Sequence, residues 1–434
     1  MTAASPDQED VKRPNGRRPA GDGATVAAPD SASMPPAPRH YWMVQWSGGG
    51  GFGHYAWLLS DALAGLGVDV RFATRRTPEL ADMPHRHRSV GVWADAPAGP
   101  PSRSRSARIA VDRLVGWLRL LRLVAWQRGS RGSRGSRGTR GMRGGRDAVV
   151  HVQAADRLAE LPFLLALRAS GATLITTAHN VRPHDTGLAG RLTMQLLYRV
   201  PHGVITHTDE AADAIRALAG SDRRVLVVRH PSYLPMVDHY MSALPPTQEM
   251  PLTVAHLGSV RPYKGLDRVV AAVQHAQLAD SGLRLAVVGR ADDEAVVAGV
   301  VSPLRSGSVR TRLGYVSIAE LVDEARAADV VMLGHRSTSE SGIAHLALGA
   351  GAVVVGPRMA AIARLLASEE SWLYDPEDPQ DAGRALTAVL AEIAADRAGL
   401  RRRARAVAEA VPSWDDVAEE TLQFVTGLRA HRHG

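Results

Sequence analysis

The segment from residue 253 to residue 267 constrains the fold of this chain more than any other stretch. It reads TVAHLGSVRPYKGLD, which predicts a strand, a glycine turn at Gly258 and a helix that begins after Gly265. Backbone N–H groups and the positive end of the helix dipole converge on such a turn, which makes it a site for an anion. Arg261 and Lys264 add two cations that can neutralise a diphosphate. The alternative is an ordinary strand-to-helix loop with solvated charges.

A second segment, residues 337–357, has the pattern of a further phosphate cradle. It reads STSESGIAHLALGAGAVVVGP, in which small polar residues precede a short helix and residues 353–355 form a buried strand. The N–H groups of Ser341 and Gly342 would then lie free at the start of the helix. The alternative is that Ser341 only caps the helix.

In this order, and about eighty residues apart, the two segments resemble those of GT-B-fold nucleotide-sugar glycosyltransferases. In the large retaining family, glycosyltransferase family 4 or glycosyl transferases group 1, a G-x-[IL]-x-P-x-KG segment and a later loop, helix and G-x-PVV strand hold the donor diphosphate. The resemblance covers residues 40–425. It implies an α/β fold of two Rossmann-like, doubly wound domains that face a cleft, with a C-terminal helix crossing back to the first domain. It also implies retention of configuration, a UDP- or GDP-sugar donor and no cofactor or metal besides this substrate.

One feature of the family is absent. The family commonly carries two Glu eight positions apart around the second segment, and Thr338 and Leu346 occupy those positions here. Some members of the superfamily show a Ser-Gly loop followed by LAL instead, which this chain resembles more closely. Glu340 is the nearby carboxylate. The donor-binding residues that the resemblance implies are Gly258, Arg261, Lys264, Glu340, Ser341 and Gly342.

Length and composition agree with a two-domain protein. A chain of 434 residues exceeds one ordinary core, and the absence of cysteine excludes disulfides and Cys-ligated metals. No apolar run approaches the roughly 18 residues of a membrane span, so we expect a cytoplasmic protein. The expected parts are a disordered tail over 1–38, an acceptor domain over 39–235, a nucleotide-sugar domain over 250–412 and a crossover helix over 413–434.

A glycine-rich loop opens the first domain. An apolar strand from Tyr41 leads into five glycines among six residues and then into a helix, which is the start of a doubly wound βαβ unit. The glycines Gly49, Gly50 and Gly51 would let a substrate approach the backbone, and His54 stands at the helix start. The alternative is a flexible connector.

Four polar residues follow a buried strand further along the first domain. The stretch TLITTAHNVRPHD places them at the carboxyl end of that strand, where they would face the cleft. The resemblance implies that His179 contacts the transferred sugar; a structurally satisfied histidine is the alternative. The spacing fits no common metal-ligand pattern. If the reaction inverted configuration instead, Asp185 or His54 would be the candidate base, and Asn180 and His184 would lie beside the acceptor.

The positive charge of the chain is concentrated in one region. Residues 101–146 hold thirteen Arg and one acid, Asp112, whereas the rest of the chain carries about −4. Residues 107–127 predict a basic amphipathic helix, and an Arg-Gly tract follows over 128–146. This pairing favours adsorption to an anionic membrane at the inner face of the cell membrane. The alternative is a core helix followed by a disordered insertion. Nucleic-acid binding is not expected, because no aromatic residue interleaves the tract. The apolar side of the helix would comprise Leu114, Trp117, Leu118, Leu121 and Val124.

The remaining pattern supports the same architecture. Further strands of the second domain are predicted at Leu283–Val288, Gly314–Tyr315 and Val330–Leu333, and Ser413 with Asp416 predicts the start of the closing helix. The function expected is therefore transfer of a hexose-type sugar from a nucleotide sugar to a polysaccharide-precursor, lipid-linked or other glycan acceptor. The alternatives are a GT-B-fold sugar-nucleotide epimerase, which would need paired carboxylates in the cleft, and a non-catalytic nucleotide-sugar-binding protein.

Overall fold

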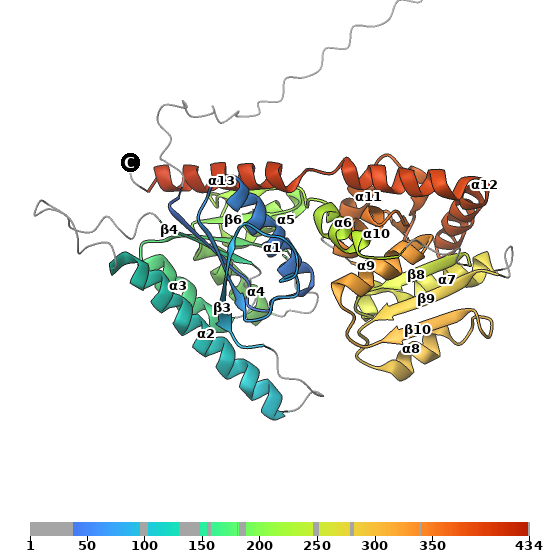
Figure 1. Cartoon of the computed structure of the whole chain (residues 1–434), viewed down its shortest axis with the longest axis horizontal. Coiled ribbons are helices and arrows are strands. Elements are labelled where there is room, and N and C mark those ends of the chain that lie inside the picture. The colour runs from blue at the N-terminus through green and yellow to red at the C-terminus, as the bar shows by residue number, and fades with distance from the viewer. Residues whose placement is uncertain are drawn as a thin grey trace, which may run out of the picture. The chain divides into compact units, whose positions relative to one another are not determined.

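Two parallel β-sheets, of seven and six strands, organise the described part of the chain (Figure 1). The structure is a computed structural model that describes residues 38–95, 103–129, 148–153, 158–179, 181, 188–245, 251–277, 282–337 and 340–432. Nearly all of the predicted tail over 1–38 and of the Arg-Gly tract over 128–146 therefore lies outside the described residues. The described residues fall within one compact unit, Pro35–Gly434.

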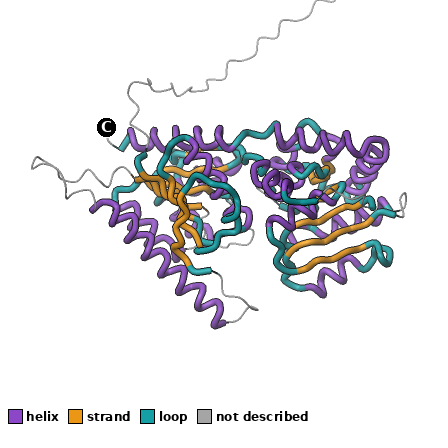
Figure 2. Tube along the Cα trace, in the orientation of Figure 1, coloured by secondary structure: helices purple, strands orange, loops and turns teal. Residues whose placement is uncertain are grey.

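The first sheet has the order β3-β2-β1-β4-β5-β6-β7, and every pair of neighbours is parallel. Figure 2 shows its strands in orange beside helices in purple. Such strands are buried on both faces, which is why they read as continuous runs of apolar and β-branched residues. The strands are β1 (His40–Val44), β2 (Val70–Arg75), β3 (Arg88–Trp93), β4 (Ala148–Gln153), β5 (Thr173–Thr177), β6 (Gly203–Thr206) and β7 (Val225–Val227).

Helices cover both faces of the first sheet. Side chains alternate along β1, so Tyr41 and Met43 pack in the cluster that contains α1, while Trp42 and Val44 pack with α2, α3 and α4. The helices are α1 (Gly50–Gly65), α2 (Arg103–Gly129), α3 (Leu161–Ala169), α4 (Leu188–Arg199), α5 (Asp209–Ala219) and α6 (Leu234–Ser242), with a 3-10 turn η1 (Leu158–Glu160) before α3.

The second sheet has the order β10-β9-β8-β11-β12-β13, again all parallel. Its strands are β8 (Thr253–Leu257), β9 (Arg284–Gly289), β10 (Val309–Leu313), β11 (Val330–Met332), β12 (Val353–Pro357) and β13 (Leu373–Tyr374). Its helices are α7 (Leu266–Ala276), α8 (Glu294–Val301), α9 (Ile318–Ala327), α10 (Gly342–Gly349), α11 (Ala360–Leu365) and α12 (Asp381–Glu409), with 3-10 turns η2 (Pro262–Lys264) and η3 (Glu370–Trp372).

The predicted strand at Gly314–Tyr315 was wrong. The strand is β10, which ends at Leu313, and the two predicted residues lie in the loop after it. β10 is at the edge of the sheet, where Arg310 and Arg312 are exposed, and this polarity hid the strand pattern in the sequence.

The C-terminal helix returns to the first domain, as the sequence predicted. Helix α13 (Trp414–Ala430) begins with a capping box in which Ser413 and Asp416 exchange hydrogen bonds. The indole of Trp414 donates to the carbonyl of Ser232 at 2.7 Å, and α13 then packs against α1. The fold is therefore the expected one: two Rossmann-like domains, a cleft between them and a crossover helix, drawn in red in Figure 1.

Helix α2 divides its predicted apolar side between the core and the surface. Trp117 and Val124 are 2% and 3% exposed and pack in the first-domain core, where Trp117 stacks on Phe163 at 5.6 Å. Leu114 and Leu118 are 50% and 45% exposed. Part of this helix is thus a core element, and a second apolar stripe stays at the surface. Within the described residues, no helix is both long enough and apolar enough to span a membrane.

Candidate active site

A cavity of about 610 Å³ lies at the carboxyl ends of the strands, where doubly wound sheets bind ligands. The first domain contributes the glycine loop and two titratable residues, His54 and Glu79. Tyr233, at the start of α6, also lines it. From the second domain come the loops after β8, β9, β10 and β11 and the first turn of α10.

Lys264 provides the cation of the second-domain wall. It ends the turn η2, and its Nζ lies 3.6 Å from the position that a Cβ on Gly258 would take. The same Cβ would meet Cγ1 of Ile343 at 3.3 Å, so Gly258, at φ +90°, lets the amine lie close to the first turn of α10. Partial burial, reinforced by the charge of Arg261, lowers the pKa of Lys264 from 10.5 to about 8.

The first turn of α10 faces the same cavity. Ser341 caps this helix, because its Oγ accepts from the backbone N–H of Ala344 at 3.4 Å. Gly342 begins the helix, and a Cβ on it would lie 3.1 Å from a ring carbon of Tyr233. The helix therefore directs its N-terminal dipole toward the space that Lys264 also borders, which is an arrangement suited to an anion.

The two predicted cations of the cradle have different surroundings. Lys264 lines the cavity, whereas Arg261 is not among the lining residues and pairs with Asp292 at the surface. Arg290, which directly follows Gly289, lines the cavity instead. The assignment of Arg261 to the donor therefore stays a prediction.

The glycine loop is held by a carboxylate that the sequence pattern did not reveal. Gly49, Gly50 and Gly51 all line the cavity at the start of α1. Oε2 of Glu79 accepts from the backbone N–H of Gly50 at 3.0 Å and from Nε2 of His54 at 2.9 Å. Glu79 thus fixes both the loop and the imidazole.

The second oxygen of Glu79 reaches the other domain. Oε1 accepts from the hydroxyl of Tyr315 and from the backbone N–H of Ile318, each at 3.1 Å. Burial acts to raise the pKa of Glu79, but hydrogen bonds from His54, Gly50 and Tyr315 and the charge on His54 outweigh it and lower the pKa to about 2. The carboxylate therefore remains ionised and joins the two domains beside the cavity.

His179 lies one layer behind the cavity wall. Its ring stacks on Phe52, a lining residue, with centroids 4.6 Å apart. Its Nε2 donates to Oε1 of Gln153 at 2.8 Å, and its Nδ1 lies 3.1 Å from Nε2 of His207. Burial, with the neighbouring charges of His207 and His151, holds the pKa of His179 well below its ordinary value, so the ring is neutral. Contact with a sugar stays a prediction for this residue.

Three of the predicted first-domain residues, Asn180, His184 and Asp185, lie outside the described residues. Thr338, one of the two positions where the family commonly has Glu, does so as well. Where side chains are described, no cluster of three His, Asp or Glu is arranged to hold a metal ion.

Solved structures share this two-domain architecture at low sequence identity. Sucrose-phosphate synthase from Thermosynechococcus elongatus is 16% identical, with a TM-score of 0.61 over 88% of this chain and 97% of that one. Trehalose 6-phosphate synthase from Burkholderia multivorans is 13% identical, with a TM-score of 0.62 over 91% of this chain and 100% of that one. HepE from Anabaena, in complex with UDP-glucose, is 13% identical, with a TM-score of 0.60 over 88% and 99%. These likenesses show the GT-B fold.

The chemistry of the second domain is identified by a family profile. The profile of the family described as Glycosyl transferases group 1 matches residues 251–392, which include Lys264 and the start of α10. The protein is a GT-B glycosyltransferase. No curated protein sequence gives a significant match to the chain.

Two residues of the candidate site were missed by sequence reasoning. Glu79 comes four residues after β2, past the carboxyl end of a strand inside the sheet, and this position was the available signal. Tyr315 carried no signal, because its partner is 236 positions away in the chain. The residues predicted from the sequence that do line the cavity are Gly49, Gly50, Gly51, His54, Gly258, Lys264, Glu340, Ser341 and Gly342.

Proposed function

We propose that this glycosyltransferase moves a hexose-type sugar from a UDP- or GDP-sugar to a hydroxyl of a polysaccharide-precursor, lipid-linked or other glycan acceptor, with retention of configuration. The observation that carries the proposal is the pairing of Lys264 with the first turn of α10 across one cavity. A cation and free N–H groups on a helix start recognise a diphosphate by the same physics as other helix-terminal phosphate sites.

The proposed reaction develops negative charge on the donor diphosphate, next to Lys264 and the first turn of α10. The bond between the anomeric carbon and the diphosphate oxygen breaks, a bond from that carbon to the acceptor oxygen forms, and the proton of the acceptor hydroxyl passes to the departing diphosphate oxygen. Negative charge grows on the departing nucleoside diphosphate. Lys264 and the N–H groups of Ser341 and Gly342 would oppose that charge without reorganising, which lowers the barrier.

The first domain supplies the acceptor side in this proposal. Gly49 to Gly51 present backbone without Cβ atoms to the cavity, and Glu79 holds them in place. HepE from Anabaena, which has the same fold, was solved with UDP-glucose and with UDP. That precedent supports a nucleotide-sugar donor, and the nucleotide sugar would be the substrate with no further cofactor.

Release of nucleoside diphosphate tests the proposal. The full chain would be incubated with a panel of UDP- and GDP-sugars, glycan acceptors and a membrane-lipid extract, with and without EDTA. We expect release from one donor that persists in EDTA and is lost in Lys264→Ala. Donor binding without release would indicate a non-catalytic binding protein. Interconversion of the donor sugar without release would indicate an epimerase.

We also propose that α2 holds the enzyme on an anionic membrane surface. Four apolar side chains of this helix are between 45% and 72% exposed, and the helix carries Arg residues on the same exposed region. Each basic residue near an anionic surface contributes about 1 kcal/mol, and the apolar side chains add burial in the headgroup layer. The exposed apolar residues are Val111, Leu114, Leu118 and Trp126.

Vesicle sedimentation separates the two contributions. We expect binding to phosphatidylglycerol vesicles, weaker binding at high salt and little binding to phosphatidylcholine. Leu118→Glu should reduce binding, whereas Leu192→Glu, at a residue 59% exposed on α4, is the matched control and should not. Deleting residues 129–145 should lower the salt-sensitive part. Equal binding to neutral and anionic vesicles, or none to either, would contradict the proposal.

A further inference from the structure

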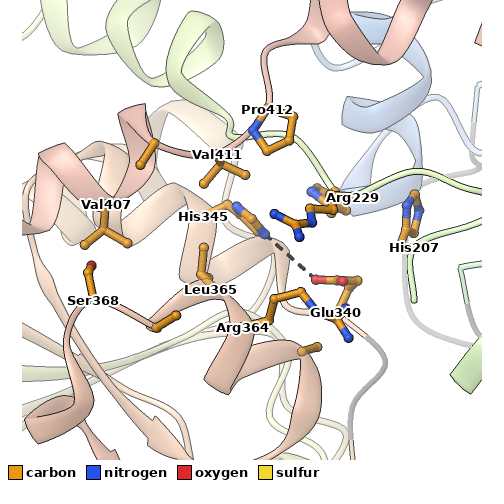
Figure 3. Close-up of a pocket in the computed structure, with 14 residues that line it drawn as sticks. His207, Arg229, Glu340, His345, Arg364, Leu365, Ser368, Val407, Val411 and Pro412 are labelled. Carbon is orange, nitrogen blue, oxygen red and sulfur yellow. Dashed lines mark ion pairs between the residues drawn. The ribbon is translucent and has the colours of Figure 1, made fainter. Parts of the chain in front are cut away.

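A second cavity, of about 220 Å³, lies apart from the donor cradle, where the two domains meet (Figure 3). We call it the hinge cavity. Arg229 and His230 reach it from the segment after β7, and Val411 and Pro412 from the link between α12 and α13. Helices α10 and α11 supply the remaining side. At about 30 Å³ for each water, the volume holds roughly seven waters, so it suits a small organic molecule and excludes a polymer.

The hinge cavity has one apolar and one polar wall. Val407, Val411 and Leu365 form the apolar wall, and Figure 3 shows them grouped on one side. On the polar wall Arg229 and His345 point toward a common space beside Glu340. A ligand that fits both walls combines a charged head with a compact carbon skeleton.

The carboxylates around the hinge cavity already have cationic or imidazole neighbours. Oε2 of Glu340 lies 3.9 Å from Nε2 of His345, and Arg364 pairs with Glu210 at 3.6 Å. Arg229 forms no ion pair and no side-chain hydrogen bond with any described residue. The exposed guanidinium of Arg229 is therefore accessible to an anion that enters the cavity.

His345 supplies a second, independent indication of a ligand. This residue is 3% exposed, and its Nδ1 has no hydrogen-bond partner among the described residues. Its ring is held in place by stacking on His230, with centroids 4.7 Å apart. Buried polar atoms in native proteins nearly always have a partner, so a ligand in the cavity would complete this one.

We propose that the hinge cavity binds a small oxyanion-bearing metabolite, a phosphorylated or carboxylated molecule, between Arg229 and His345. The site is distinct from the proposed donor site, because Lys264 lines only the other cavity. Its walls come from both domains, so the bound anion stabilises the arrangement in which the domains meet. Glu340 borders both cavities, and its backbone directly precedes the α10 turn that faces the donor. Binding of the anion in the hinge cavity therefore changes the affinity of the donor site for its ligand.

Phosphate titration tests this site on the full chain. Binding of inorganic phosphate, and of glycerol 3-phosphate against neutral glycerol, would be followed by ³¹P NMR line width and by thermal unfolding. We expect saturable binding of both anions, no binding of glycerol, and at least tenfold weaker binding in Arg229→Gln. Arg229→Lys should bind more tightly than Arg229→Gln, because it keeps the charge.

Two control variants keep the result unambiguous. Arg224→Gln removes an exposed Arg that directly precedes β7 and does not line the cavity, and it should bind phosphate like wild type. Lys264→Ala should also retain phosphate binding at the hinge. If Lys264→Ala loses phosphate binding and Arg229→Gln keeps it, the anion occupies the donor cradle and the hinge proposal fails. Absence of saturable binding to wild type would overturn it as well, without bearing on donor recognition.

Discussion

The hydroxyl of Tyr315 donates to Oε1 of Glu79 at 3.1 Å, although the two residues belong to different domains. The same carboxylate accepts from Ile318 in the second domain and from Gly50 and His54 in the first. One ionised group therefore satisfies donors on both sides of the donor cavity. We infer that Glu79 couples the position of the glycine loop to the position of the second domain.

Replacing this carboxylate should cost far more than removing one of its donors. Glu79→Ala leaves two backbone N–H groups and His54 without their acceptor, so we expect a loss of about 2–3 kcal/mol in the free energy of unfolding. Tyr315 is 77% exposed, and Tyr315→Phe should cost less than about 1 kcal/mol. Urea unfolding of both variants measures this. Equal losses would show that Glu79 contributes through Tyr315 alone.

Acid should weaken the protein partly through the same group. The folded-state pKa of Glu79 is about 2, below its ordinary value of 4.5, so its contribution is present above about pH 4.5 and is lost as the pH falls toward 2. Glu79→Gln removes this titration. Between pH 5 and pH 3 the wild type should therefore lose more stability than Glu79→Gln, and parallel curves would contradict the assignment.

A pair of glycine substitutions tests how tightly the donor cradle is built. A Cβ on Gly289, where φ is +140°, would lie 1.9 Å from the carbonyl oxygen of Gly258. Gly289→Ala should therefore destabilise the domain and displace the cradle. Gly299 lies within α8 with no atom within 4 Å of its Cβ position, so Gly299→Ala should stabilise by roughly 0.5–1 kcal/mol. Thermal unfolding compares them, and similar effects at both sites would refute the steric argument.

The donor cradle was predictable because its parts are local. Gly258 and Lys264 belong to one strand–turn–helix segment, and Ser341 and Gly342 to another, so the sequence pattern alone places each at a strand or helix end. Which cation of the first segment faces the cavity was not predictable. That choice depends on the 3-10 turn and on Asp292, a residue of a different loop that binds Arg261.

Contacts between distant segments account for what the sequence did not reveal. Glu79 sits in a loop without a recognisable pattern, and its importance arises from donors that the fold brings to it. Helix α2 shows the same limit. The spacing of its apolar residues correctly predicts a helix, but the spacing does not indicate which of these residues are buried in the core and which are exposed. Trp117 found a partner in Phe163 of α3, whereas Leu118 found none that buries it.

Substitution of His179 should separate a role in catalysis from a role in folding. His179→Ala removes the ring that stacks on Phe52, a cavity residue, so turnover should fall more than donor affinity. It also removes the partner of Oε1 of Gln153 and of Nε2 of His207 in the core, which should cost about 1–3 kcal/mol of stability. Turnover, donor affinity by calorimetry and urea unfolding would be measured together. Unchanged turnover in a folded variant would make His179 purely structural.

Donor binding should weaken as the pH rises above 8, because Lys264 then loses its proton. Burial and the charge of Arg261 set the pKa of this amine near 8, and the diphosphate of a nucleotide sugar keeps its charge in this range. The protonated fraction falls about tenfold between pH 7 and pH 9, so the Kd should rise about tenfold. Lys264→Arg should show a flat profile, since guanidinium stays charged. Arg261→Gln should move the midpoint to higher pH, because it removes a neighbouring positive charge.

The chain has only two lysines, Lys12 and Lys264, so the rate of amine labelling at Lys264, read by peptide mass spectrometry, reports its pKa directly. Labelling with a midpoint near 10.5, or labelling that a bound nucleotide sugar fails to suppress, would show that this amine is not the one that meets the diphosphate.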